Sequence, residues 1–269
     1  MAHIRSPDPF FLFAWLLGGL FILLSLLALL VIAIPELADP AGLVAVAMDQ
    51  RVLESLALTF AAGCSAVIVL MVFGTPLAYA LSRTSSRYKG IIESLIDLPL
   101  ALPHTVAGLM IYLLFMSRGL IGGPLASTGI FFEDEFIGIV MAMIFVSSPY
   151  YINTVREGFE RVPLHLEYVA RTLGATPFAA FRRIALPLCS RHIGSGALLA
   201  WGRAVGEFAA VIMIAYFPMV ISALIYQRFS IGGIDESRSI AFMMIIICIV
   251  VFYAIRYLVQ RRGVPDDRP

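Results

Sequence analysis

The sequence predicts an all-α integral membrane protein with six transmembrane helices, and three observations lead to this fold class. The 269 residues are 60% hydrophobic and only 14% charged, whereas soluble domains carry about 25% charged residues. The apolar residues form long continuous blocks, not the alternating pieces of about ten residues that are typical of a β-barrel. A helix of about 20 apolar residues spans a bilayer, and lipid favours helices because each backbone group must be satisfied within the segment.

Six apolar blocks define the expected spans. The first is too long for the apolar core of a signal peptide, which has about 7–15 residues, so we expect an uncleaved span. The second contains Thr75-Pro76, a predicted kink. The third is expected to start irregularly because Pro99 and Pro103 interrupt it. The blocks cover about 10–34, 53–81, 98–116, 136–152, 188–214 and 240–259.

The charges of the connecting segments predict the orientation of the chain. Basic residues mark the cytoplasmic side of a membrane, and the segments 82–96 and 155–191 and the C-terminal tail carry an excess of them. The segments 35–52 and 117–135 each carry one arginine against three acidic residues. This alternation predicts a multi-pass protein of the cytoplasmic membrane with both termini in the cytoplasm. The segment 217–239 is neutral and gives no information.

The sequence lacks the residue motifs that several classes of function require. No GxxxxGK(S/T) phosphate loop is present, so the chain is not expected to bind ATP by that route. Cys64, Cys189 and Cys248 are far apart and predict no metal site. No HExxH, His-rich or paired-Asp cluster occurs, and no basic cluster suggests a nucleic-acid partner. We therefore expect neither catalysis nor a cofactor in this chain.

The segment 164–187, LHLEYVARTLGATPFAAFRRIALP, is too polar to span a membrane and too regular for an irregular loop. Pro163 suits the first turn of a helix, and Gly174 suits a left-handed C-terminal cap. Thr176 suits the N-cap of a second helix with Pro177 at its first position. One face of the first helix carries Leu166, Val169, Ala170 and Leu173.

The second helix of this segment is expected to present an apolar face and to end just before the fifth span. Phe178, Phe181 and Ile184 form that face, and Pro187 is the expected end. Two interpretations remain open from the residues alone. The segment is either an amphipathic element on the membrane surface or a projection that inserts into a groove of a partner protein.

The same segment resembles the coupling motif of ABC importer permeases, which runs Glu-Ala-Ala, three residues, Gly, nine residues and Ile-x-Leu-Pro. Glu167 stands one residue earlier than in the motif, Tyr168 takes its place and Val169 replaces one alanine. The resemblance implies that the two helices dock into a cleft on an ATP-binding subunit, which would hold the ATP and magnesium. The residues implied in this coupling are Glu167, Ala170, Gly174, Ala175, Ile184, Leu186 and Pro187.

A second resemblance covers nearly the whole chain from about residue 53. The stretches DLPLALPHTVAGL (97–109), EYVARTLGATP and WGRAVGEFAAVIMIAYFP (201–218) resemble molybdate/tungstate permeases of the archaeal type. Sulfate and thiosulfate permeases are similar in the same regions. The resemblance implies a type I ABC importer transmembrane domain that occupies residues 1–269. Its first span would cover about 10–34, its permease core about 53–259 and its coupling element about 164–187.

The family resemblance also implies partners. Two copies of the chain would form one pore in the lipid membrane, with two ATP-binding cassette subunits and an extracytoplasmic oxyanion-binding protein. The alternatives are a sulfate or thiosulfate permease, an ion-coupled secondary transporter, and a membrane enzyme or receptor. The lack of a convincing internal repeat argues weakly against an inverted-repeat transporter.

Two charged residues lie within the fifth apolar block. Arg203 and Glu207 are four residues apart on one helical face, near the middle of the block, where a charge costs about 2.5–3.5 kcal/mol or more. They form either an internal ion pair that fixes helix packing or, with Arg203, part of a passage for a doubly charged oxyanion. The Arg-before-Glu order is the weaker helical arrangement, which leaves open a partner for Glu207 on another helix.

Small and polar residues nearby complete the candidate sites. Gly202, Gly206 and Ala210 form a small-xxx-small pattern that favours close helix packing, in a bundle centre or at a dimer seam. His104 and Thr105 follow Pro103 at the start of the third span. They are either packing residues or contacts of the translocation pathway.

Overall fold

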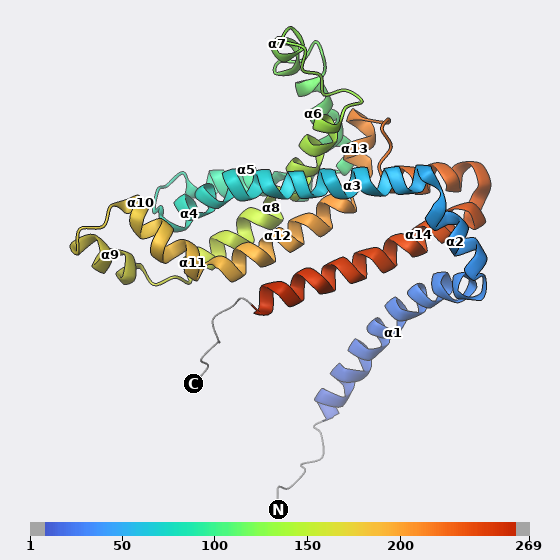
Figure 1. Ribbon diagram of the computed structural model, residues 1–269. Helices are drawn as coiled ribbons and strands as arrows, with labels where there is room; N and C mark the ends of the chain where they lie inside the picture. Colours follow the sequence, from blue (N-terminus) through green and yellow to red (C-terminus); the bar gives the residue numbers. More distant parts are fainter. Residues whose placement is uncertain (1–8, 262–269) are drawn as a thin grey trace, which may run out of the picture.

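The computed structural model describes residues 9–261, with side chains described as far as residue 257, and in this part of the chain it consists of helices and connecting turns (Figure 1). The predicted all-α class is therefore confirmed. Two of the elements, η1 and η2, are π-helical turns. In chain order the elements are α1 (Pro9–Ala38), α2 (Pro40–Met48), α3 (Gln50–Val69), η1 (Leu70–Gly74), α4 (Thr75–Arg83), α5 (Lys89–Ala101), α6 (His104–Phe115), α7 (Gly122–Ala126), α8 (Phe136–Glu160), α9 (Leu164–Thr172), α10 (Pro177–Ala180), η2 (Phe181–Ala185), α11 (Leu186–Leu188), α12 (Ser190–Val205), α13 (Ala209–Ile214) and α14 (Ile221–Arg261).

Four helical stretches in the described residues are long and apolar enough to cross a membrane: Pro9–Ala38, Gln50–Arg83, Phe136–Glu160 and Ile221–Tyr257. They match the first, second, fourth and sixth predicted blocks. The pair α5 and α6 would count as a fifth span, although it bends by 113°. The predicted number of six stays a prediction, because the fifth block does not form one long helix.

The third block breaks where one of its two prolines predicts a break. Leu102 has an extended backbone (φ −83°, ψ 140°), which is the conformation that a following proline imposes. Pro103 is the N-cap residue of α6. Pro99, in contrast, lies buried inside α5, so the irregular start expected there is wrong for Pro99 and confirmed for Pro103.

The fifth block was expected to be one helix over 188–214, and this is wrong. α12 ends at Val205 and α13 begins at Ala209. Gly206 is the C-cap residue of α12. The Glu207 carboxylate accepts a hydrogen bond from the backbone N–H of Ala210 at 2.8 Å, which satisfies one of the free N–H groups at the start of α13.

The sixth block also differs from the prediction, because its helix begins at Ile221 and not near residue 240. Most of the segment 217–239, expected to be a loop, is therefore helical. α14 has one non-helical residue, Gly233 (φ 77°, ψ −159°), where two helical arms meet. Figure 1 shows the chain turning back there, from a short orange arm into a long red arm.

Both π turns lie directly before a proline in a helix. η1 precedes Thr75-Pro76, and η2 precedes Leu186-Pro187. A proline has no N–H for the normal helical bond and its ring crowds the preceding turn, and a π turn is one way in which a helix accommodates such a change. The chain thus remains helical through Pro76, whereas the helix that contains Pro187 ends at Leu188, one residue beyond the predicted end, and α12 begins at Ser190.

α8 lies at the centre of the fold, packed against α3, α4, α5, α6, α12 and α13. Its side chains Ile139, Met143, Tyr151 and Phe159 are fully buried. α1, in contrast, is exposed over residues 9–31 and contacts α2 and α14. An apolar helix so exposed presents its surface to lipid or to another membrane helix.

Segments that were predicted to share a side of the membrane meet in the structure. At one end, Arg83 pairs with Glu167 and Lys89 with Glu160. At the other end, polar contacts join the acidic segments to the stretch 216–239: Arg238–Glu36 at 2.6 Å, Arg228–Asp49 at 3.0 Å and Tyr216 N to Asp134 at 2.8 Å. Figure 1 shows α9 to α11 at one end and α2 with the turn of α14 at the other. Which end faces the cytoplasm stays a prediction.

A close approach between α6 and α13 gives a test of this packing. A Cβ atom at Gly108 would lie 2.7 Å from the Ala210 Cα and 2.8 Å from the Met213 Cβ. We expect Gly108→Leu to destabilise the fold by about 1–3 kcal/mol, the usual cost of overpacking. Thermal unfolding of the purified protein in detergent measures the effect, with Gly18→Leu as the control because nothing lies within 4 Å there. Equal melting temperatures for both variants would contradict the close approach.

Candidate functional site

The segment 164–187 folds as two short helices that meet at Gly174, as predicted. Gly174 has φ +93°, in the left-handed region. Its N–H bonds to the carbonyl of Arg171 at 3.1 Å, and the N–H of Ala175 bonds to that of Ala170 at 3.0 Å. These two bonds define a Schellman motif, in which a glycine stops a helix without strain. Ala170 and Ala175 are thereby brought together at the joint.

The second helix begins with the predicted cap. The hydroxyl of Thr176 accepts a hydrogen bond from the N–H of Ala179 at 3.1 Å, and Pro177 takes the first helical position. α10 then continues through η2 and α11. The helical bonds do not stop at Pro187, because Cys189 N bonds to Ala185 O and Ile193 N bonds to Cys189 O, both at 3.0 Å. The segment therefore leads directly into α12.

The outer side of the joint is apolar and exposed. Leu173 is 82% exposed and Phe178 is 67% exposed, and Val169 and Tyr168 beside them are exposed as well. We call these four residues the joint surface. Exposed apolar clusters on a folded protein mark sites of interaction with proteins or membranes.

The inner side of the segment is held by an ion pair that the sequence did not reveal. The buried carboxylate of Glu167 accepts hydrogen bonds from Arg83 Nε at 3.1 Å, Arg83 Nη2 at 2.6 Å and the Tyr79 hydroxyl at 2.5 Å. Arg83 also donates to the carbonyls of Phe159 at 2.9 Å and Val162 at 3.3 Å. One guanidinium thus joins α4, the end of α8 and α9.

The apolar face predicted for the second helix is only partly covered. Phe181 packs inward against Tyr79, with ring centroids 4.7 Å apart, and against Phe159 at 6.1 Å. Phe178 is exposed, and its ring lies 6.4 Å from that of Phe181. Ile184 and Leu186 are half-buried, and Pro187 is exposed. Phe178 and Phe181 therefore share a face, as predicted, but only Phe181 is covered by the body of the protein.

The fold brings together three of the four predicted pathway residues. Arg203 Nη2 donates to Glu207 Oε2 at 2.6 Å, and the nearer His104 ring nitrogen lies 3.0 Å from the same Nη2. Glu207 is 2% exposed, while the side chains of Arg203 and His104 are 19% and 46% exposed. The predicted internal ion pair is confirmed, and His104 extends it to α6. Thr105 follows His104 on α6 and is exposed.

The small residues predicted to pack closely do so at one position of three. Ala210 is fully buried against Gly108. Gly202 and Gly206 are exposed. A Cβ atom at Gly202 would find its nearest neighbour, in Phe252, at 4.0 Å, and one at Gly206 would meet Gly202 O of the same helix at 3.5 Å. Gly202 and Gly206 therefore mediate no close helix contact within the described chain, and a dimer seam at these residues stays a prediction.

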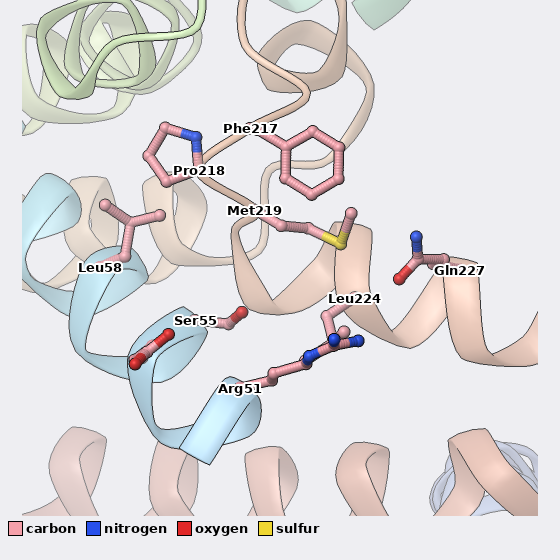
Figure 2. A pocket seen from close by; sticks show the side chains of 9 residues that line it. Arg51, Ser55, Leu58, Phe217, Pro218, Met219, Leu224 and Gln227 are labelled. Atoms are coloured by element: carbon pink, nitrogen blue, oxygen red, sulfur yellow. The ribbon is translucent and has the colours of Figure 1, made fainter. Parts of the chain in front are cut away.

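A pocket of about 580 Å³ lies at the opposite end from the joint surface (Figure 2). Figure 2 shows Arg51 reaching from the start of α3 toward the first arm of α14, below Phe217 and Met219. Sequence reasoning missed this pocket because its walls come from segments about 160 residues apart. The lining residues are Arg51, Glu54, Ser55, Leu58, Phe217, Pro218, Met219, Leu224 and Gln227.

Tyr79 and Arg83 are the functional candidates that sequence reasoning missed. Arg83 was counted as a loop charge only. The signal for their role was their spacing, because residues four apart at the end of an apolar helix lie on one face. Their partner Glu167 lies 84 positions beyond Arg83, so the pairing itself was not readable from local sequence.

Comparison with protein families gives one match that covers most of the chain. The model of the binding-protein-dependent transport system inner membrane component family matches residues 71–265. The molybdate/tungstate transport system permease protein WtpB of Thermococcus kodakarensis is 35% identical over 97% of this chain and 100% of its own length. WtpB of Pyrococcus furiosus is 36% identical over 91% and 93%, and the sulfate transport system permease protein CysT of Salmonella typhimurium is 33% identical over 81% and 80%.

Solved structures share the fold at low sequence identity. A chain of a bacterial alginate ABC transporter, solved with an alginate-bound periplasmic protein, superposes with a TM-score of 0.64 at 18% identity, covering 92% of this chain and 94% of its own. A chain of the MetNI methionine ABC transporter, in an inward-facing conformation, gives a TM-score of 0.62 at 17% identity, covering 80% and 95%. The predicted type I importer fold is thereby confirmed.

The ion pair between Arg83 and Glu167 gives a second test. We expect Arg83→Leu to destabilise the protein by about 3–5 kcal/mol, because it leaves a buried carboxylate without its partner. The double variant Arg83→Leu/Glu167→Leu is expected to regain a large part of that loss. Thermal unfolding in detergent measures both, with the exposed Arg87→Leu as the control. An Arg83→Leu variant as stable as Arg87→Leu would show that the pair contributes little.

Proposed function

Because the chain belongs to the family of binding-protein-dependent transport system inner membrane components, we propose that it moves a molybdate- or tungstate-type oxyanion inward as the permease subunit of an ATP-driven importer. It is a multi-pass membrane protein, and the ATPase of such a transporter is a separate subunit. The observation that carries the proposal is the segment 164–187, with an exposed apolar joint outside and a fixed ion pair inside.

The joint surface suits docking to the ATPase subunit. Val169, Leu173 and Phe178 offer apolar area that water does not favour, and the Schellman motif at Gly174 keeps that area in one shape. A preorganised surface loses little conformational entropy on binding. The alternative of an amphipathic element lying on the membrane is less favoured, since the segment packs against α4 and α8 through Arg83 and Phe181.

Glu167 contributes to coupling from the inner side. Its carboxylate is turned toward Arg83 and Tyr79 and away from the joint surface. We therefore assign it the role of holding α9 on α4 and α8, while the exposed Tyr168, which stands at the motif position, faces the partner. A push on the joint surface then moves α4 and the end of α8 together with α9.

The substrate follows from the relatives and from the charge in the membrane. Four archaeal molybdate/tungstate permeases are 34–36% identical to this chain, and three sulfate permeases are 29–33% identical. Molybdate and tungstate are tetrahedral dianions, and a cationic side chain such as Arg203 suits their passage. Sulfate transport is the alternative within the family, and an ion-coupled transporter that works without an ATPase is the alternative outside it.

The working assembly is a homodimer of this chain with two ATP-binding cassette subunits and an extracytoplasmic binding protein, both termini lying in the cytoplasm. ATP and magnesium are bound by the cassette subunits. Transport proceeds by alternating access, as closure of the ATPases on ATP displaces the segment 164–187. Its helical continuity with α12 through Cys189 transmits that displacement to the helix that carries Arg203.

The substrate assignment is tested by reconstitution. The permease and its ATPase are placed in proteoliposomes with the binding protein, and ATP hydrolysis and uptake are measured with each oxyanion. We expect stimulation by molybdate and tungstate and little by sulfate. Stimulation by sulfate alone would overturn the substrate, and uptake driven by an ion gradient without the ATPase would overturn the importer.

The coupling role is tested at Gly174. We expect Gly174→Glu to insert into the membrane normally and to lose association with the ATPase, because it places strain and charge at the joint. Co-purification of the ATPase with the permease is the measurement. Gly129→Glu is the matched control, since Gly129 also has a positive φ (86°) and open space but lies in the segment 117–135. Normal association and transport in Gly174→Glu would remove the joint from the docking site.

A further inference from the structure

The cluster of Arg203, Glu207 and His104 lies where two helix breaks meet. His104 is the first residue of α6, directly after the 113° bend, and Glu207 lies in the break between α12 and α13. His104 Nδ1 is 3.9 Å from Glu207 Oε2, and Arg203 Nη2 contacts both residues. Two polar side chains, one from α6 and one from the break after α12, thus converge on one guanidinium nitrogen of Arg203.

Arg203 keeps most of its donors free. Within the described part of the chain, every hydrogen bond of the Arg203 side chain is made by its Nη2 atom. The one buried side-chain nitrogen or oxygen without a partner in the described part of the chain is Nε of Arg156. Nε and Nη1 of Arg203 are therefore unpaired and accessible. A guanidinium with free N–H groups on one edge is suited to bind two oxygens of an oxyanion at once.

Two exposed glycines flank Arg203 along the chain and place no side chain beside it. Gly202 precedes it on α12 and Gly206 is the C-cap residue of that helix, and neither contacts another helix closely. The His104 ring beside it is nearly half exposed. Glu207 is thus buried, whereas the side chains of Arg203 and His104 are partly exposed.

We propose that Arg203 and His104 form a weak, transient binding site for a tetrahedral dianion in the translocation path, with Glu207 as the positioning residue. The inference rests on the proposed function and names the chain's own contact with the substrate. The Oε1 atom of Glu207 accepts a hydrogen bond from Ala210 N, and Oε2 accepts one from Arg203. Glu207 therefore fixes the guanidinium and offsets its positive charge. This partial neutralisation of Arg203 keeps the affinity for the oxyanion low, and a transport site must bind weakly enough for the ion to leave.

Because Glu207 offsets the charge of Arg203, we expect substitutions at these two residues to change oxyanion binding in opposite directions. Glu207→Gln keeps an oxygen for Ala210 N and removes the negative charge beside Arg203. We expect it to tighten oxyanion binding by at least about tenfold, since unit charges a few ångströms apart interact by several kcal/mol at intermediate dielectric. Arg203→Gln and the double variant are expected to abolish binding. Structural damage alone produces losses and no gain.

The measurement is equilibrium binding of molybdate to the purified permease–ATPase complex in detergent, without the binding protein. Arg228→Gln is the matched control, because it breaks the Arg228–Asp49 pair (3.0 Å) at the other end of the chain and should leave molybdate binding unchanged. Unchanged or weakened binding in Glu207→Gln, or retained binding in the double variant, would overturn the proposal.

A second variant covers the case in which Glu207→Gln does not assemble. Arg203→Lys keeps the charge and the partner Glu207 but loses the planar set of donors, and we expect at least about fivefold weaker binding and slower uptake. Wild-type binding in Arg203→Lys would overturn the site. Failure of the proposed function appears separately, as a wild-type complex in which none of the oxyanions stimulates ATP hydrolysis.

Discussion

The pair of Arg83 and Glu167 is the interaction on which the arrangement of the proposed coupling end depends. Arg83 closes the helical span that begins at Gln50, and from there it reaches α9 and the last carbonyls of α8. A charged group in an apolar setting is stable only when its hydrogen-bonding capacity is met, and this guanidinium meets it on three elements at once. The joint at Gly174 is consequently attached to the body of the protein, although its outer surface is uncovered. Rigidity inside and exposure outside are the two properties that a force-transmitting surface needs.

The same constraint explains where the spans break. In lipid, a backbone group freed by a break must find a partner within the protein. At the break after α12, the carboxylate of Glu207 accepts from Ala210 N and its carbonyl accepts from Ser222 Oγ at 2.8 Å. At the break before α6, the Pro103 carbonyl begins the new helix by accepting from Ala107 N at 3.0 Å. The breaks are thus stabilised positions, where freed backbone groups find partners and polar side chains come together.

Coupling segment and intramembrane cluster are connected by one nearly continuous helix. η2, α11 and α12 follow one another with helical hydrogen bonds across Cys189, and Arg203 lies two residues before the end of α12. In the proposed coupling, a displacement at the joint would change the position of Arg203 relative to His104, which belongs to the separate pair α5 and α6. In the proposed cycle, this helix directly links closure of the ATPase subunits on ATP to the geometry of the anion site.

The sequence by itself determined the helical membrane class, four of the spans to within a few residues at their starts or ends, and the local chemistry of the joint, because apolar block length, glycine and threonine caps act over neighbouring residues. Charge in the connecting segments predicted which of them share a side of the membrane, but it gave no information on the segment 217–239. Only the tertiary structure decided that Gly206 and Gly233 break their helices, since a broken and a continuous helix present the same hydropathy. It also decided that Glu167 turns inward to Arg83 and that His104 joins Arg203, because hydrogen-bond partners 84 and 99 positions apart are selected by packing and leave no local signal.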